Sequence, residues 1–284
     1  MIAFDPRTTP ARPDLAAAHL KGKVDAARFV EGTDHVVTRG RVALRAQPSA
    51  DASLETELLF GQKFRVYETA NGWAWGQSAF DCCVGYAHTI ACEAKPAAAD
   101  HRIIALATPL LPAADAKRPA LDLLPMNAAV TVLGHEKGFA RIAPDGYVFE
   151  GHLEPVGKFA SDWVAVAERF VGTPYVWGGR THAGLDCSGL VQTALEACGV
   201  HAPRDTDLQE KVLGQRLDCR PDFSDLLRGD LLFWNGHVAI ALDAFRMLHA
   251  TSFHMEVRVE PLLDTVRRIE PVSGAITSVK RLKK

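Results

Sequence analysis

The stretch Leu185-Asp-Cys-Ser-Gly-Leu-Val191, preceded by Thr173-Pro-Tyr-Val-Trp-Gly-Gly179, decides how this chain folds. Beyond Cys187, apolar residues recur at spacings of three and four as far as Cys198, and Gly199 then offers a helix stop. The spacing predicts a helix whose first turn holds Cys187. Unpaired backbone N–H groups and the helix dipole favour a thiolate there, and such positions lower a cysteine pKa from ~8.5 to roughly 3.5 to 7.5. The pattern therefore predicts an activated sulfur nucleophile.

Two histidines farther along the chain can serve this nucleophile. His237 opens an apolar run after the turn Asn235-Gly236, and His249 ends the next apolar run. Both runs are strand-like, so an antiparallel pair joined at residues 243–244 would bring the two imidazoles together on one sheet face. A thiolate needs a base within hydrogen-bond reach, and the base needs a third group that fixes its tautomer. With the helix of Cys187 packed on that sheet, the sequence predicts a Cys187, His237, His249 relay.

Five ordered motifs in the second half of the chain carry a family resemblance. By these motifs the chain resembles the NlpC-type cell-wall cysteine peptidases, a papain-like family, over about residues 160 to 275. The resemblance implies that Cys187 is the nucleophile, His237 the general base and His249 the polar residue that orients it. It also implies an α+β catalytic domain, with helices packed on an antiparallel sheet. The motifs are Pro174-Tyr-Val-Trp-Gly-Gly179, Leu185-Asp-Cys-Ser-Gly-Leu-Val191, Gly229-Asp-Leu-Leu-Phe233, His237-Val-Ala-Ile240 and Leu248-His-Ala250.

The first half of the chain contains a repeat of short alternating strands. Gly72-Trp73 matches Gly138-Phe139, and Gly85-Tyr86 matches Gly151-His152, at a spacing of 66 residues. Turn residues every eight to twelve positions predict small all-β barrels, and the repeat resembles paired bacterial SH3-like barrels. We therefore expect an N-terminal extension over 1–34 with a short helix near Asp14 to Leu20, SH3-like barrels over 35–97 and 98–158, and the peptidase domain over 159–284.

Composition excludes several classes of function. The chain has 284 residues, is 48% hydrophobic and carries a net charge of −2, so neither nucleic acid nor anionic membrane is an expected partner. The N-terminus lacks a basic segment followed by an apolar core, and no uncharged apolar stretch reaches the ~20 residues of a membrane-spanning helix. Six cysteines without C-x-x-C pairs argue against a structural zinc and a disulfide framework. We expect a cytoplasmic enzyme that needs no metal or organic cofactor, and its oligomeric state stays open.

Charged and aromatic residues near the nucleophile are candidates for binding substrate. Asp186, Ser188 and Asp205 could pair with a free amine, although Asp and Ser residues also cap helices and shape turns. Trp177 is either core packing or a pocket wall. The Tyr175 hydroxyl and the backbone N–H of Cys187 are candidates for stabilising an oxyanion.

The resemblance extends to a role for the first barrel. In family members built this way, that barrel encloses the free N-terminus of the substrate with a Tyr and an acid, which implies Tyr86 and Glu57, or else Glu55. A half-buried barrel position for Tyr86 is the alternative. The mismatch between Tyr86 and His152 in the repeat indicates that the barrel itself does not require this Tyr.

The resemblance implies hydrolysis of the bond between γ-D-glutamate and a diamino acid in murein peptides with a free N-terminal L-Ala. This is the reaction of the γ-D-glutamyl-L-diamino acid endopeptidases of murein peptide recycling, and the murein peptide is the expected partner. The preferred diamino acid is left open. Alternatives are an amidase or acyltransferase of the same papain-like fold, or a non-catalytic peptidoglycan-binding protein. The intact set Cys187, His237 and His249 argues against the last.

Overall fold

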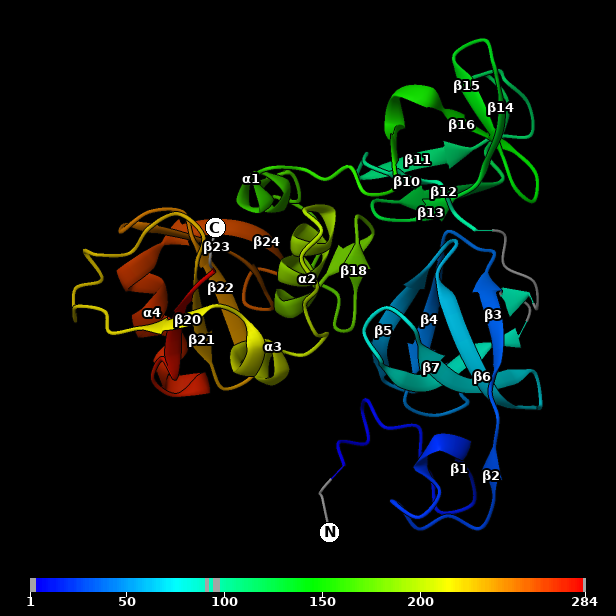
Figure 1. Ribbon diagram of the computed structural model, residues 1–284. Coiled ribbons are helices and arrows are strands. Elements are labelled where there is room, and N and C mark those ends of the chain that lie inside the picture. The colour runs from blue at the N-terminus through cyan, green and yellow to red at the C-terminus, as the bar shows by residue number, and fades with distance from the viewer. Residues whose placement is uncertain (1–3, 90–91, 94–97, 283–284) are drawn as a thin grey trace. The chain divides into compact units, whose positions relative to one another are not determined.

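The computed structural model describes residues 4–89, 92–93 and 98–282, and the chain divides into two compact units, residues 1–158 and 159–284 (Figure 1). The first unit is almost entirely β-structure, and the second combines helices with one large sheet. Within the described ranges, no helix is long and apolar enough to cross a membrane.

The first unit begins with a segment that packs onto the first barrel instead of standing apart as an extension. Leu15 and Ala17 are fully buried and form one apolar cluster with Tyr67 and Trp75 of the barrel. The expected helix near Asp14 to Leu20 is a short strand and a single 3₁₀ turn, because the chain pairs in parallel with residues 29–30. The elements of this segment are β1 (Ala16–Ala17), η1 (Ala18–Leu20) and β2 (Phe29–Val30).

The first barrel is a seven-stranded sheet in the order β5-β4-β8-β7-β6-β3-β9. Its strands alternate buried and exposed residues, as in β4, where Val42 and Leu44 point into the core and Arg41 points out. The strands are β3 (Thr33–Val37), β4 (Arg41–Arg45), β5 (Leu54–Leu59), β6 (Lys63–Ala70), β7 (Trp73–Ser78), β8 (Val84–His88) and β9 (Cys92–Glu93).

The second half of this unit has its own apolar core and three small sheets. Its backbone repeats the turns of the first barrel. Asn71 and Gly72 adopt φ of 51° and 80°, while Lys137 and Gly138, 66 residues later, adopt 50° and 79°. Two successive left-handed residues are what a tight hairpin turn requires. The elements are β10 (His101–Ile103), β11 (Ala107–Leu110), β12 (Asp122–Pro125), β13 (Ala129–Val130), β14 (Val132–Glu136), β15 (Phe139–Ile142), β16 (Tyr147–Phe149), η3 (Glu150–His152) and β17 (Leu153–Pro155).

Strand pairing corrects the alignment of the repeat at Tyr86. In the first barrel Trp75 lies opposite Tyr86, and in the second module Arg141, 66 residues after Trp75, lies opposite Tyr147. The counterpart of Tyr86 is therefore Tyr147 and not His152, which lies in the following 3₁₀ turn. The loop before β16 is shorter than the loop before β8, so residues after this loop no longer align at a spacing of 66. A Tyr at this position occurs in both copies, so the argument that the barrel does not require it is wrong.

The second unit is built on a six-stranded antiparallel sheet in the order β20-β25-β21-β22-β23-β24 (Figure 1). Helix α2 packs against β22 and β23, and α1 and α3 flank α2. Helix α4 contributes Leu262 and Ile269 to the core formed with this sheet. This is the α+β architecture that the sequence predicts. The elements are α1 (Trp163–Glu168), β18 (Arg180–Thr181), β19 (Gly184–Leu185), α2 (Cys187–Ala197), α3 (Thr206–Val212), β20 (Gln215–Leu217), β21 (Asp230–Trp234), β22 (His237–Ala241), β23 (Arg246–Thr251), β24 (Glu256–Pro261), α4 (Leu262–Ser273) and β25 (Ser278–Arg281).

Phe60 tests whether the two β modules of the first unit fold together. It follows the last residue of β5, yet its ring is 5% exposed in the core of the second module, and its carbonyl accepts the N–H of Ala129. Because Phe60→Ala removes a core ring, we expect a loss of about 3 to 5 kcal/mol in urea unfolding. The control is Phe245→Ala. Because Phe245 is 79% exposed, its replacement should change the unfolding free energy by less than about 0.5 kcal/mol. A Phe60 variant as stable as this control would contradict the shared core.

Candidate active site

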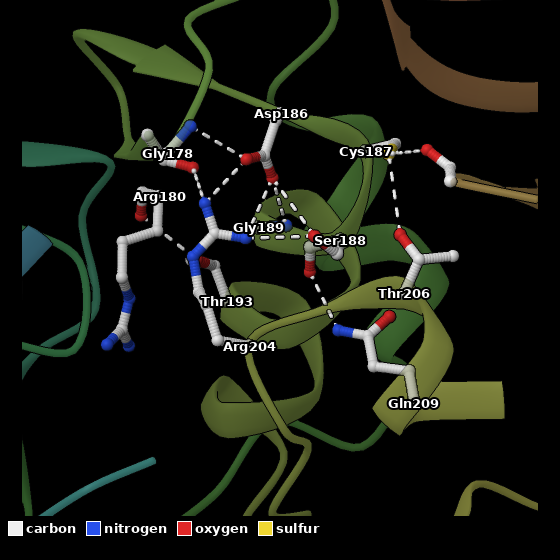
Figure 2. Close-up of polar contacts among 12 residues, drawn as sticks. Gly178, Arg180, Asp186, Cys187, Ser188, Gly189, Thr193, Arg204, Thr206 and Gln209 are labelled. Carbon is white, nitrogen blue, oxygen red and sulfur yellow. Dashed lines mark hydrogen bonds and ion pairs between the residues drawn. The ribbon is translucent and has the colours of Figure 1, made fainter. Parts of the chain in front are cut away.

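Cys187 is the first residue of helix α2, as the apolar spacing predicts. Residue Asp186 caps the helix, and its Oδ1 accepts the backbone N–H of Gly189 at 2.7 Å. The Cys187 side chain is 6% exposed and points away from Asp186 toward Thr206 (Figure 2). The N–H of Cys187 has no hydrogen-bond partner in the described part of the chain, as expected of the first turn of a helix.

The Asp186 carboxylate is fully used inside the protein. Arg204, itself 2% exposed, contacts Oδ2 at 2.6 Å through Nη2 and Oδ1 at 2.9 Å through Nη1. Oδ2 also accepts the N–H of Gly178, and Oδ1 the hydroxyl of Ser188 (Figure 2). The Asp186 and Ser188 side chains are therefore engaged within the protein, and their pairing with a substrate amine stays a prediction. Both are buried, and the capping alternative is the one that the structure supports.

The glycines around this network allow neighbouring backbone segments to pack closely against one another. A Cβ on Gly189 would lie 2.2 Å from the carbonyl oxygen of Gly179, and a Cβ on Gly179 would lie 2.4 Å from that of Gly184. The loop before the nucleophile is thus pressed onto the first turn of α2. Gly179 and Gly189 are needed for this internal contact, because a Cβ on either would meet a backbone carbonyl.

The sulfur of Cys187 lies against the turn that carries His237. It is 4.0 Å from the carbonyl oxygen of Gly236 and 3.9 Å from the hydroxyl of Thr206, and the N–H of Val238 also points to it. The two chain neighbours of His237 therefore flank the sulfur. Within the described residues, no hydrogen bond joins the sulfur to the His237 ring in this state.

Burial decides the resting protonation of the pair. Desolvation, together with the nearby Asp186 charge, raises the pKa of the Cys187 thiol to about 11. Desolvation lowers the pKa of His237 to about 3, and the charge of Arg268, and of His249 whenever it is protonated, acts in the same direction. The expected lowering of the Cys187 pKa by the helix N-terminus is outweighed by burial. The resting site holds a thiol and a neutral imidazole.

The two histidines meet as the strand pattern predicts. Strands β22 and β23 pair antiparallel, with Ile240 opposite Leu248, and Nε2 of His237 lies 2.8 Å from Nδ1 of His249. His249 is 1% exposed. Its Nε2 lies 2.7 Å from Oε2 of Glu260, a contact that the sequence analysis missed. Local spacing gives no sign of it, because the register of β23 with β24 brings Glu260 there.

The remaining candidates of the second unit lie around the nucleophile. Asp205 is half-buried and immediately precedes Thr206, which touches the sulfur. Tyr175 is also half-buried, and desolvation together with the charges of Cys187 and Asp186 raises the pKa of its phenol. Its hydroxyl therefore stays protonated and can donate. Trp177 is 65% exposed, so it is a surface residue and not core packing.

The candidates of the first unit have partners within that unit. The Tyr86 hydroxyl accepts from Nη1 of Arg12 at 2.9 Å, and the Arg12 guanidinium lies 4.4 Å from the centre of the Trp75 ring. Glu57, in β5, is paired with Arg41 at 2.6 Å. The expectation that Tyr86 and Glu57 contact substrate stays a prediction. In the part of the chain that the structure describes, no group of three or more His, Cys, Asp or Glu side chains is arranged to hold a metal ion.

Removal of Arg204 tests the buried network. Arg204→Met leaves the Asp186 carboxylate buried without its counterion, so we expect a loss of about 3 to 5 kcal/mol in unfolding free energy. Adding Asp186→Asn should recover part of that loss, because the unpaired charge is then gone. Arg246→Met, which breaks an exposed pair with Asp243, should cost less than about 1 kcal/mol. Additive losses in the double variant would contradict the coupling.

The low pKa of His237 has a consequence for acid stability. The unfolded chain takes up a proton near pH 6.5, and the folded chain does so only near pH 3, so stability falls as the pH drops below about 6.5. Between pH 7 and pH 5 this one group should remove about 2 kcal/mol. In urea unfolding, the unfolding free energy of His237→Gln should fall by about 2 kcal/mol less than that of wild type between pH 7 and pH 5. The control His201→Gln, at an exposed position, should show the same fall as wild type. Equal slopes for wild type and His237→Gln would show that the imidazole is not buried neutral.

Comparison with known proteins agrees with this geometry. Residues 172–268 match the model of the NlpC/P60 family, and residues 44–89 match that of the bacterial dipeptidyl-peptidase SH3 domain. The chain resembles the γ-D-glutamyl-L-lysine dipeptidyl-peptidase of Bacillus cereus, at 30% identity over 139 residues, which is 46% of this chain and 40% of that protein. It also resembles dipeptidyl-peptidase 6 of Lysinibacillus sphaericus, at 34% identity over 116 residues, covering 41% of this chain and 40% of the relative. These matches span less than half the length of either relative.

Solved structures show the same fold. A crystal structure of an NlpC/P60 family protein from Bacillus cereus superposes with a TM-score of 0.72 over 88% of this chain and 99% of that one, at 17% identity. An NlpC/P60 endopeptidase from Photobacterium damselae gives 0.64 over 87% of this chain and 71% of that one, at 12% identity. With Cys187 at the start of α2 and His237 at the start of β22, residues 172–268 form a domain that matches the NlpC/P60 family, and the match to the bacterial dipeptidyl-peptidase SH3 domain lies ahead of it in the chain.

Proposed function

We propose that this protein is a cysteine peptidase that cleaves the bond between γ-D-glutamate and a diamino acid in murein peptides with a free N-terminal L-Ala. The observation that carries the proposal is the sulfur of Cys187 at the start of α2, flanked by the chain neighbours of His237, with His237 in contact with His249. The substrate class is supported by the name of the Bacillus cereus relative, a γ-D-glutamyl-L-lysine dipeptidyl-peptidase.

The reaction starts from a thiol and a neutral imidazole. We expect rotation of the Cys187 side chain to bring its thiol to His237, which takes the proton as the sulfur attacks the carbonyl carbon. The free N–H of Cys187 and the protonated Tyr175 hydroxyl are the donors for the developing oxyanion. His237 then gives the proton to the leaving amine, and water hydrolyses the thioester.

Recognition of a free amine needs an acid other than Asp186, whose oxygens are already bonded. Asp205 is half-buried and immediately precedes Thr206, whose hydroxyl lies against the Cys187 sulfur. A desolvated ammonium must be paired with an anion, so Asp205 is the counterion that we propose. Glu57 and Tyr86 of the first barrel are proposed to close the far end of the bound peptide, and Trp177 to form a wall beside it.

Such a specificity suits recycling of released wall fragments, since the stem peptides of intact murein have no free amine at L-Ala. We therefore propose that the enzyme works in the cytoplasm on free peptides. An acyltransferase of the same fold would transfer the acyl group of the Cys187 thioester to an amine instead of to water.

Replacement of Cys187 tests the chemistry. Cys187→Ala should abolish cleavage of L-Ala-γ-D-Glu-L-Lys, measured by release of the diamino acid, and leave the fold intact. Cys198→Ala, at the other end of the same helix, should retain wild-type turnover. Turnover near wild type in the Cys187 variant would remove this residue from the role. A product conjugated to added amine in place of free dipeptide would favour the acyltransferase.

The free amine tests the substrate class. The free tripeptide should be cleaved at least tenfold better, in kcat/KM, than its N-acetylated form or the same peptide attached to sugar, because each of these lacks the ammonium. Asp205→Asn should reduce this preference and leave Cys187 reactive. Equal rates on free and sugar-linked peptides would contradict a role in recycling.

A further inference from the structure

Beneath the two catalytic histidines lies a buried carboxylate. Glu260, the fifth residue of β24, is 9% exposed. Its Oε2 contacts Nε2 of His249 at 2.7 Å and Nη2 of Arg268 at 2.6 Å, and its Oε1 contacts Nε2 of His254 at 3.0 Å. Strand β23, the turn after it and helix α4 thus each direct one donor at the same carboxylate.

We propose that Glu260 is a positioning residue of the active site, whose carboxylate fixes, through His249, the tautomer in which Nδ1 of His237 carries the lone pair that accepts the Cys187 proton. The proposal rests on the role of Cys187 and His237 in the proposed function. It adds a fourth residue behind them and says which nitrogen is the base.

The first step of the argument is the charge of Glu260. Burial favours its neutral form, but hydrogen bonds from His249 and His254 and the charge of Arg268 outweigh it and lower the pKa to about 2. The side chain is therefore an anion, and an anionic carboxylate can only accept hydrogen bonds. His249 must then carry its proton on Nε2.

The second step follows along the relay. In the proposed arrangement His249 is neutral, so its one N–H lies on Nε2 and its Nδ1 is an acceptor. The 2.8 Å contact then requires Nε2 of His237 to donate. His237 is neutral at ordinary pH, as its low pKa of about 3 shows. Its only N–H is used in this contact, and Nδ1 is left bare. Protonation of His249 on both nitrogens would reverse the contact and move the His237 proton to Nδ1, where it would block the base.

The third step is how the arrangement survives the reaction. The proton leaves Sγ of Cys187 for Nδ1 of His237 as the S–C bond forms, and later passes from Nδ1 to the leaving nitrogen. Glu260 keeps its charge throughout, because Arg268 and His254 hold it, and it stabilises the imidazolium from behind. Arg268 is itself stacked 4.1 Å from the centre of the Phe253 ring, which meets the His254 ring at 4.8 Å. Two of the three donors to the carboxylate are therefore themselves packed against the Phe253 ring.

The tautomers can be read directly in the wild-type protein. In the full chain with ¹⁵N-labelled histidine, we expect NMR at pH 8 to show His249 and His237 both protonated on Nε2 and bare on Nδ1. A His237 that carries its proton on Nδ1 at this pH would overturn the proposal. This measurement needs neither a substrate nor a variant.

Variants separate the hydrogen bond from the charge. Glu260→Leu removes both, and Glu260→Gln keeps an oxygen that can still accept from His249 and Arg268. Alkylation of Cys187 by iodoacetamide, located by mass spectrometry, should slow on the order of 10²-fold in the Leu variant and less in the Gln variant. Peptidase kcat should fall in the same order, with KM within about twofold.

The control is Glu256→Gln, on the same strand, which only loses its exposed pair with Arg258 and should match wild type. A folded Glu260→Leu protein that is alkylated at the wild-type rate would overturn the proposal. Alkylation needs no peptide, so it reports on Glu260 independently of the substrate. If alkylation slows in the Glu260 variants as expected but the wild-type protein cleaves no murein peptide, the proposed function is contradicted and the role of Glu260 is not.

Discussion

The ion pair between Asp186 and Arg204 is the contact on which the site depends. One buried carboxylate joins the loop at Gly178, the first turn of α2 and the residue just before the Asp205-Thr206 step (Figure 2). Cys187 follows Asp186 directly, and Thr206, two residues after Arg204, touches the sulfur. Burying two charges adds little net stability compared with apolar packing, because desolvation offsets their attraction. What the pair supplies is position, since neither charge can move without leaving the other unpaired.

The same burial sets the resting chemistry. A helix N-terminus favours a thiolate, yet around Cys187 the loss of water is the larger effect, and the pKa of the thiol is about 11. His237, also desolvated, is neutral. The resting site therefore holds an uncharged pair, and in the proposed reaction the two charges form only after substrate is bound. Such a resting state protects the sulfur from oxidation, which requires a thiolate.

Prediction from sequence was accurate where the signal was local and failed where it was not. The helix start at Cys187, the turn at Asn235-Gly236 and the antiparallel pair that brings His237 to His249 all follow from periodicity and turn residues. The pairing of Asp186 with Arg204 could not be predicted, because Arg204 lies eighteen residues away in the sequence. The repeat was recognised from its turns, but Tyr86 was matched to His152 because a shorter loop shifted the following strand.

The sequence by itself determined the helix that begins at Cys187 and the strand pair that carries His237 and His249, because apolar spacing and glycine turns are properties of a few neighbouring residues. Only the tertiary structure decided the burial of Cys187, the contacts of Asp186 and the position of Glu260 beside His249. Strand register and packing choose such partners from distant parts of the chain. An isolated Glu or Arg in the sequence carries no mark of the side chain that it will meet.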